Sequence, residues 1–216
     1  MYRRDPTMLG PLSKAIEIVT LHGERISLAK KLCAAHPVDR PHNAQYDDRL
    51  LDVLTEACAF AWVAQVAKLG RPHFCFQSAA PDLQIDPEGW VEAKAVHPSE
   101  EDQRRSKRML EERQVVSGQV TPAGQGLYEK IRVDFNKAER QLAGRDGPKV
   151  VFFNLTALDL PQRVDEAVEE AELESVVGLI QGLVCEKPDV DAAAFCHRYL
   201  WEETRLLGRL PESAVL

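Results

Sequence analysis

The residues of this chain best suited to chemistry lie close together in the sequence, between Pro81 and Lys94. The segment Pro-Asp-Leu-Gln-Ile-Asp-Pro-Glu-Gly-Trp-Val-Glu-Ala-Lys places Asp82 ten residues before Glu92. If these two acids lie on neighbouring strands and face one another, their carboxylates repel and lose hydration unless a cation lies between them. A hard divalent ion with oxygen ligands meets that need, and magnesium is the natural candidate.

The elements that must position these residues are short strands. Three segments have strand character and are separated by turn residues: His73–Gln77, Pro81–Ile85 and Trp90–Val96. Because side chains alternate along a strand, Glu92 and Lys94 share one face, while Val91 and Ala93 share the other. The pattern therefore predicts a β-meander that presents an acid and an amine on the same face.

The register between the second and third strands decides whether the site can form. Pairing Ile85 with Trp90 would turn Asp82 to the wrong face, because a one-residue slip reverses every side chain. Pairing Gln84 with Trp90, through a five-residue loop or a bulge, places Asp82 opposite Glu92. We expect the second register.

Helices and one more strand surround the meander. Four segments have the spacing of helices with an apolar face: Asp47–Leu69, Leu127–Leu142, Pro161–Gly182 and Asp189–Leu207. The run Lys149–Leu155 is apolar without alternation, which is typical of a strand covered on both faces. The predicted fold class is α/β, with a central mixed β-sheet made of the three-strand meander plus a strand after a crossover helix, flanked by helices.

Composition divides the chain into three expected parts. Residues 1–44 form an N-terminal helical extension, 45–160 the core, and 161–216 acidic C-terminal helices that pack on it. From residue 159 onward there are 13 acids and 5 bases (−8), which leaves 21 acids and 22 bases (+1) before it. With a pI of about 5.4, the chain as a whole lacks the charge of a basic nucleic-acid-binding protein.

Cysteine usage and the lack of a leader sequence predict a cytoplasmic, reducing location. Five cysteines occur without a Cys-x-x-Cys pair, which argues against a disulfide framework. The N-terminus has no apolar core of signal-peptide length, and the longest uncharged apolar stretch, residues 57–67, is too short to span a bilayer. We expect no association with a membrane.

The pattern Pro81-Asp82 followed by Glu92-x-Lys94, in this order of elements, resembles the PD-(D/E)XK nuclease superfamily, which has a restriction-endonuclease-like fold. The resemblance implies that Asp82, Glu92 and the backbone carbonyl of Ala93 bind one or two magnesium ions, with manganese as an alternative ion. It also implies that Lys94 positions or activates the attacking water.

The same resemblance covers roughly Tyr46 to Leu155 and implies further site residues. Members often add a Glu from the first helix, which here corresponds to Glu56. This side chain would hold a second ion or orient a metal-bound water. A polar residue from the helix after the meander often joins the site as well, and here Lys137 or Gln141 fits that position.

The function implied is a metal-dependent nuclease that hydrolyses phosphodiester bonds, with DNA as substrate and a homodimer as a form suited to double-strand cleavage. Cationic side chains expected to contact phosphates, without sequence readout, are Arg104, Arg105, Lys107, Arg108, Lys130, Arg132 and Lys137. The alternative is a non-catalytic DNA-binding or protein-interaction module that keeps the nuclease fold. A third hypothesis is a hydrolase of another phosphoester, such as RNA.

Structural explanations compete with each assignment. Asp82 after a proline also suits a turn, and Glu92 with Lys94 also suits the exposed face of an edge strand. Glu56 and the pair Lys137 and Gln141 also suit solvated stripes of helices, and the basic run at residues 104–108 a solvated surface. These explanations predict that the side chains are exposed to solvent.

Overall fold

The structure is a computed structural model that describes residues 6–35, 44–67, 69–77, 80–96, 125–155, 166–196, 200–208 and 210 of the 216-residue chain. The basic run that contains Arg104 and Arg105, with Lys107 and Arg108, lies outside the described residues.

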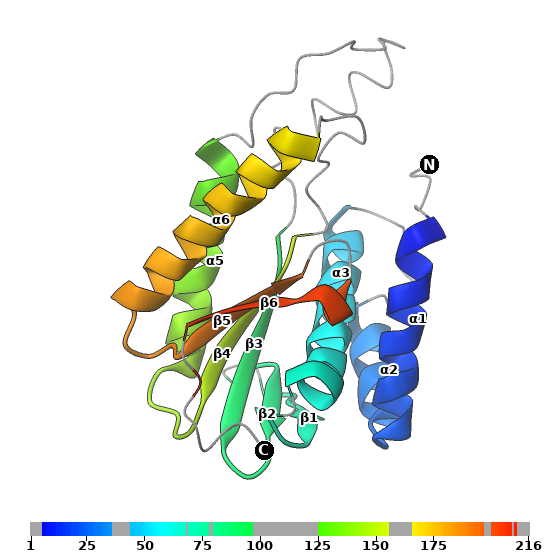
Figure 1. Cartoon of the computed structure of the whole chain (residues 1–216). Helices are drawn as coiled ribbons and strands as arrows, with labels where there is room; N and C mark the ends of the chain where they lie inside the picture. Colours follow the sequence, from blue (N-terminus) through cyan, green and yellow to red (C-terminus); the bar gives the residue numbers. More distant parts are fainter. Residues whose placement is uncertain are drawn as a thin grey trace.

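A six-stranded mixed sheet forms the centre of the fold (Figure 1). In spatial order its strands are β1 (Pro72–Phe74), β2 (Leu83–Ile85), β3 (Gly89–Ala95), β4 (Lys149–Asn154), β5 (Ala192–Cys196) and β6 (Arg205–Gly208). The three central strands β3, β4 and β5 are parallel, and the remaining pairs are antiparallel. The predicted α/β class with a mixed sheet is confirmed, and so is the three-strand meander.

In the part of the chain that the structure describes, five α-helices lie on the two sides of the sheet. One face is covered by α3 (Ala44–Trp62), which continues as a π-helical turn, Val63–Ala67, and α1 (Pro6–Leu21) and α2 (Arg25–Ala35) pack against α3. The other face is covered by α5 (Gln125–Leu142) and α6 (Glu166–Glu186). The helices α5 and α6 are the two crossovers that make β3, β4 and β5 parallel, since parallel pairing needs a connection of this length.

Alternate residues of β4 supply two separate hydrophobic cores. Val150 and Phe152 pack on the α3 side, where the ring of Phe152 lies 5.7 Å from that of Trp62. Val151 and Phe153 pack on the other side, where Phe153 stacks on Phe135 of α5 at 6.2 Å. The apolar run Lys149–Leu155 lacks alternation because both faces are covered, as the sequence predicts.

Helix α3 contains a long apolar segment. Together with its π-helical turn it spans Arg49–Ala67, which is long and apolar enough to cross a membrane by length and composition. In the structure this segment packs against the sheet and against α1, and Ala57 to Val63 are buried. A helix that lies in a protein core has the same composition, so this segment is weak evidence for a membrane span.

The prediction of a helix over Asp189–Leu207 is wrong. That stretch contains β5, a 3₁₀ turn (η2, Trp201–Glu203) and β6, so the described part of the C-terminal region contributes one helix and two strands of the sheet. Every residue of β5 is buried, because the strand lies between β4 and β6 and is covered on both faces. Tertiary burial therefore overrides the helix propensity of its alanines.

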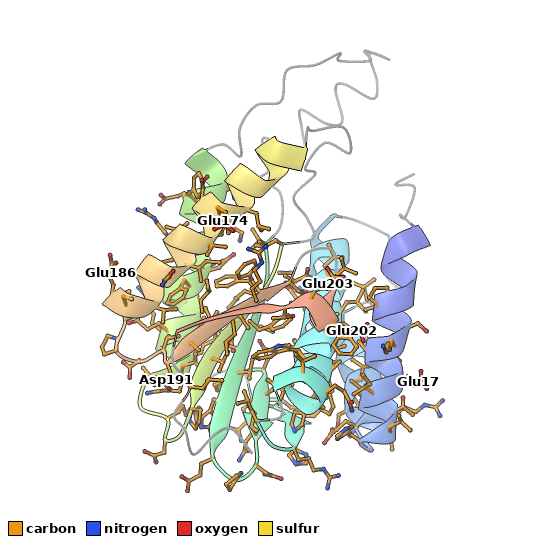
Figure 2. The ribbon with its side chains drawn as sticks, viewed as in Figure 1. Glu17, Glu174, Glu186, Asp191, Glu202 and Glu203 are labelled. Carbon is orange, nitrogen blue, oxygen red and sulfur yellow. The ribbon has the colours of Figure 1, made fainter. Side chains whose placement is uncertain are left out.

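Exposed acidic side chains lie on the outer surface of the helices rather than in the cores (Figure 2). Glu174 and Glu186 lie along α6, Glu202 and Glu203 on η2, and Glu17 on α1. Part of the C-terminal acidity found in the sequence is therefore a solvated surface.

Candidate active site

The strands β2 and β3 pair in the register that the candidate site requires. Leu83 pairs with Val91, Gln84 with Trp90 and Ile85 with Gly89. The loop is therefore shorter than the predicted five residues, although the predicted register is confirmed. Asp82 directly precedes β2, and this register places it opposite Glu92.

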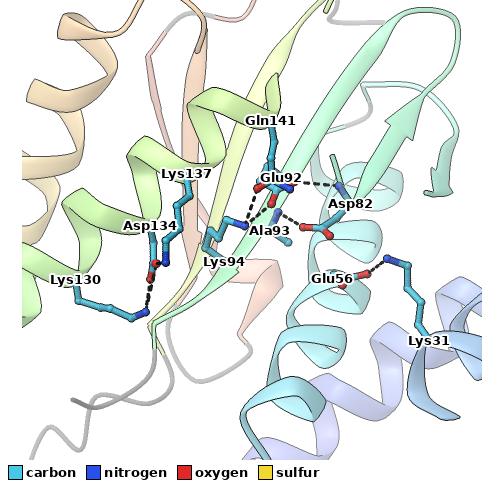
Figure 3. Close-up of polar contacts among 10 residues, drawn as sticks. All are labelled: Lys31, Glu56, Asp82, Glu92, Ala93, Lys94, Lys130, Asp134, Lys137 and Gln141. Atoms are coloured by element: carbon cyan, nitrogen blue, oxygen red, sulfur yellow. Dashed lines mark hydrogen bonds and ion pairs between the residues drawn. The ribbon is translucent and has the colours of Figure 1, made fainter. Parts of the chain in front are cut away.

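Two hydrogen bonds tie Asp82 to β3 (Figure 3). The backbone N–H of Asp82 donates to Oε2 of Glu92 at 3.1 Å. In return, the backbone N–H of Ala93 donates to Oδ2 of Asp82 at 2.9 Å. Each acid is thus oriented by the backbone of the other segment, which brings the two carboxylates to the same place. Asp82 is therefore held against β3, in addition to any role that it has in opening a turn.

The carbonyl of Ala93 belongs to the same edge of β3 as these bonds. In an extended strand, the N–H and C=O of one residue point toward the same neighbouring strand. The N–H of Ala93 points to Asp82, beyond the last paired residues Leu83 and Val91. Its carbonyl oxygen therefore also faces the end of β2, where the two acids meet.

Lys94 lies on the same face of β3 as Glu92 and is the third charged residue of the cluster. Its ammonium group contacts Oε1 of Glu92 and donates to Oε1 of Gln141 on α5 at 3.1 Å. Glu92 is 1% exposed, and the side chain of Lys94 is 21% exposed. Because β3 lies inside the sheet and these side chains are covered, the explanation as an exposed edge-strand face is wrong.

Glu56 approaches the site from α3 and is held by a lysine of α2. Its Oε2 lies 2.5 Å from Nζ of Lys31, and both side chains are largely buried. The carboxylates of Asp82 and Glu92 lie close enough to raise the pKa of Glu56. Glu56 is therefore a buried member of the acidic cluster, and the explanation as a solvated stripe is wrong.

Burial and mutual repulsion disturb the ionisation of the three acids. Burial, followed by the charge of Asp82, raises the pKa of Glu56 to about 8 and that of Glu92 to about 7. Burial also raises the pKa of Asp82, although the charge of Lys94 lowers it. Burial by itself would lower the pKa of Lys94, but the adjacent Glu92 outweighs it and the pKa of Lys94 is raised.

Of the other predicted residues that the structure describes, only Gln141 contacts these groups. Lys137 and Lys130 instead form ion pairs with Asp134 of the same helix, at 3.5 and 3.0 Å. Their side chains are 59% and 37% exposed. Lys137 and Lys130 thus stay near the site on α5 without touching Asp82 or Glu92.

Sequence reasoning missed three charged residues of this region. Lys31 lies in the segment interpreted as an extension, and nothing in its local sequence connects it with Glu56. Asp52 on α3 raises the pKa of Asp82, and Asp134 on α5 raises that of Lys94. Asp134 does have a sequence signal, since it sits between Ile131 and Ala138, on the apolar side of its helix.

The donor set suits one hard divalent ion better than two. Asp82 and Glu92 with the carbonyl of Ala93 are oxygen donors at one point, and water would complete the shell of magnesium or manganese. Within the ranges that the structure describes, no group of three or more His, Cys, Asp or Glu side chains is placed to hold an ion. Glu56 does not complete such a group, because it faces Lys31.

Comparison with known proteins adds no relative to this picture. No family model, no curated protein and no solved structure matches the chain. Function must therefore be inferred from the residues themselves and their arrangement.

Proposed function

We propose that this chain is a metal-dependent nuclease that hydrolyses phosphodiester bonds, with DNA as its substrate. The observation that supports it is the meeting of Asp82, Glu92 and Lys94 in one largely buried cluster, in which backbone N–H groups orient both acids. Perturbed carboxylates beside an amine are typical of catalytic sites rather than of solvated surfaces.

The arrangement of elements supports a restriction-endonuclease-like, PD-(D/E)XK fold as the finer assignment. Helix α3 precedes the meander β1–β3, and α5, β4 and α6 follow it, with the acids and the lysine on β3 and at the end of β2. This order and these positions are the ones that the resemblance in the sequence implies.

The chemistry proposed follows from the donors present. A bound magnesium or manganese ion supplies Lewis acidity toward the phosphate and lowers the pKa of a coordinated water. Asp82, Glu92 and the carbonyl of Ala93 would hold that ion. Lys94 would donate a hydrogen bond to the attacking water or to the negative charge that develops on the phosphate. Gln141 orients Lys94 through the 3.1 Å bond to its ammonium group.

Lys130 and Lys137 on α5 are proposed phosphate contacts next to this cluster. Both ammonium groups share the Asp134 carboxylate and remain partly open to solvent. Exposed lysines of this kind strengthen binding to a polyanion in a salt-dependent way, without reading its sequence.

The test is a cleavage assay with purified full-length protein. Supercoiled, linear and single-stranded DNA and RNA are incubated with magnesium or manganese, and with EDTA. The variants are Asp82→Asn and Lys94→Ala, with Glu88→Gln in the exposed β2–β3 turn as a matched control. We expect the parent and Glu88→Gln to cleave DNA only with the ion, and the two site variants to be inactive.

Other outcomes separate the competing functions. Cleavage of RNA alone would assign the site to a different phosphoester. Equal cleavage by the parent and both site variants would contradict the mechanism. Ion-independent binding of DNA without cleavage would favour the non-catalytic module that keeps the fold.

A further inference from the structure

We propose that Lys31 is a built-in cation of the site, which takes the place of a second divalent ion beside Glu56. The inference rests on the proposed function and deepens it, because it assigns a one-ion site to the nuclease. It also makes the N-terminal helix α2 a part of the site rather than an extension of the core.

Lys31 and Glu56 form a close, buried contact. Nζ of Lys31 lies 2.5 Å from Oε2 of Glu56, and the two side chains are only 14% and 10% exposed. An ion pair this covered is screened little by solvent, unlike a surface pair. The close-up shows Lys31 reaching from α2 to Glu56 on α3, on the side of Asp82 away from Lys94 (Figure 3).

Aromatic rings of the fold also hold the ammonium group of Lys31 in place. The group lies over the rings of Phe74 and Phe76, at 5.8 and 5.7 Å from their centroids. A cation over an aromatic face is stabilised by the ring, and more so where water is excluded. Phe74 belongs to β1 and is buried, so the fold itself supplies part of the seat for Lys31.

The balance of charge in the cluster favours a single divalent ion. The cluster contains three carboxylates and two ammonium groups, from Glu56, Asp82, Glu92, Lys31 and Lys94. When all are ionised, three negative and two positive charges leave an excess of one negative charge. One divalent ion would more than neutralise the remaining charge, and a second would have to displace Lys31.

These observations give Lys31 a positioning role. It pairs with Glu56, which leaves Asp82 and Glu92 as the two acidic side chains that the described residues offer to an ion. A site of this composition carries a permanent positive charge where a two-ion site would carry its second ion.

The chain offers a matched control for Lys31. Lys30 precedes it on α2, carries the same charge and is exposed, without contact to the acidic cluster among the contacts that the structure describes. Replacing either lysine by methionine removes the same charge from the protein, and only one replacement should change the site.

The experiment is calorimetric titration of full-length protein with magnesium chloride at pH 8.5, where a buried carboxyl with a raised pKa is more fully ionised. We expect one ion per chain for the parent and for Lys30→Met, none for Asp82→Asn, and two for Lys31→Met. Circular dichroism of each variant reports whether it is folded.

A double variant keeps the test decisive if Lys31→Met does not fold. Lys31→Met with Glu56→Gln removes one positive and one negative charge, and we expect it to bind one ion with the affinity of the parent. A loss of affinity of about tenfold or more would show that Glu56 is an ion ligand, and would overturn the inference.

The outcomes separate this inference from the proposed function. Two ions on the parent, or one ion on both the parent and folded Lys31→Met, would overturn the role of Lys31 and leave a metal-dependent nuclease intact. If the parent binds no ion, the proposed metal-dependent function fails, and the inference fails with it.

Discussion

Two clusters of lysines and carboxylates lie close to α5, and they are built in different ways (Figure 3). In one, Asp82, Glu92 and Lys94 come from the end of β2 and from β3, with Glu56 from α3 nearby. In the other, Asp134 and its two lysine partners all belong to one helix.

Burial alone does not distinguish the two clusters. Glu92 is 1% and Asp134 is 4% exposed, so each contains a covered carboxylate. Asp134 is neutralised by lysines at i−4 and i+3, whose long side chains reach it and still contact water. The first cluster gathers more acids than ammonium groups. An excess of acids that come from distant segments therefore indicates a functional site better than burial does.

The largest expected effect is a difference in the rate of DNA cleavage between variants of the two clusters. Asp82→Asn should lower the rate of DNA cleavage with magnesium by about 10² to 10³-fold, because it removes a charge that would hold the ion. Asp134→Asn, which removes an equally covered carboxylate from α5, should retain most of the parental rate. Initial rates at one magnesium concentration that saturates the parent measure both.

Equal losses in the two variants would break this comparison. In that case Asp134 would belong to the site, through its influence on the charge of Lys94. Equal and full retention of cleavage would instead remove the proposed role of Asp82.

The next effect concerns how stability depends on pH when no divalent ion is present. The pKa values of Glu56 and Glu92 rise from 4.5 to about 8 and about 7 on folding. Between these limits the folded chain holds more protons than the unfolded chain, so the free energy of unfolding should fall as pH rises from about 4.5 to 8.

Urea unfolding of the parent and Glu56→Gln at pH 5, 6, 7 and 8, with EDTA, measures that slope. Glutamine cannot ionise, so the variant should lose less stability over this range, by an amount on the order of a few kcal/mol. Parallel curves for the two proteins would contradict the raised pKa of Glu56.

A smaller effect on the free energy of unfolding is expected for His73, which contacts two segments that are distant in the sequence. His73 on β1 contacts Glu24, between α1 and α2, at 2.9 Å and Asp86 in the β2–β3 turn at 3.0 Å. The hydrogen bond with Glu24 raises the pKa of His73 above 6.5, despite the opposing effect of burial, and Asp86 raises it further.

The stability that His73 adds should therefore be fully present below about pH 6.5 and be lost as pH rises through the folded pKa. His73→Gln should cost roughly 0.5 to 1 kcal/mol at pH 5.5 and less at pH 8.5, a small value because the ring is partly exposed. The same difference at both pH values would rule out a charged His73.

The smallest expected effect returns to the second cluster. Lys137→Ala removes an exposed partner of Asp134, whose other lysine remains. The free energy of unfolding should fall by about 0.5 kcal/mol or less. A thermal melt measures the change, and a loss of several kcal/mol would show that Asp134 depends on Lys137.

Much of the candidate site follows from local sequence. Alternation along β3 places Glu92 and Lys94 on one face, and the requirement that Asp82 face Glu92 for a site to form selects the pairing of Gln84 with Trp90, which the structure has. Gln141 is one of two α5 residues implied by the family resemblance, and the structure places it, rather than Lys137, in contact with Lys94. Lys31 does not follow, because its partner belongs to another helix and only the packing of α2 on α3 joins them.

The C-terminal part of the fold also could not be predicted from local sequence alone. The segment Ala192–Cys196 is as apolar as a buried strand and as alanine-rich as a helix, and its local pattern does not decide between them. Its neighbours β4 and β6 decide, because they provide backbone partners on both sides of the segment. The basic residues Arg104 and Arg105 lie outside the described residues, so their role stays a prediction.

The amino-acid sequence by itself determined the strand that carries the acid and the amine, since side-chain alternation depends only on the local backbone. It also determined that the strand after the crossover helix is covered on both faces. Only the tertiary structure decided which cation neutralises Glu56 and how many acids remain for an ion. Those outcomes depend on distances between α2, α3 and β3, which are set by packing of the cores and not by any spacing along the chain.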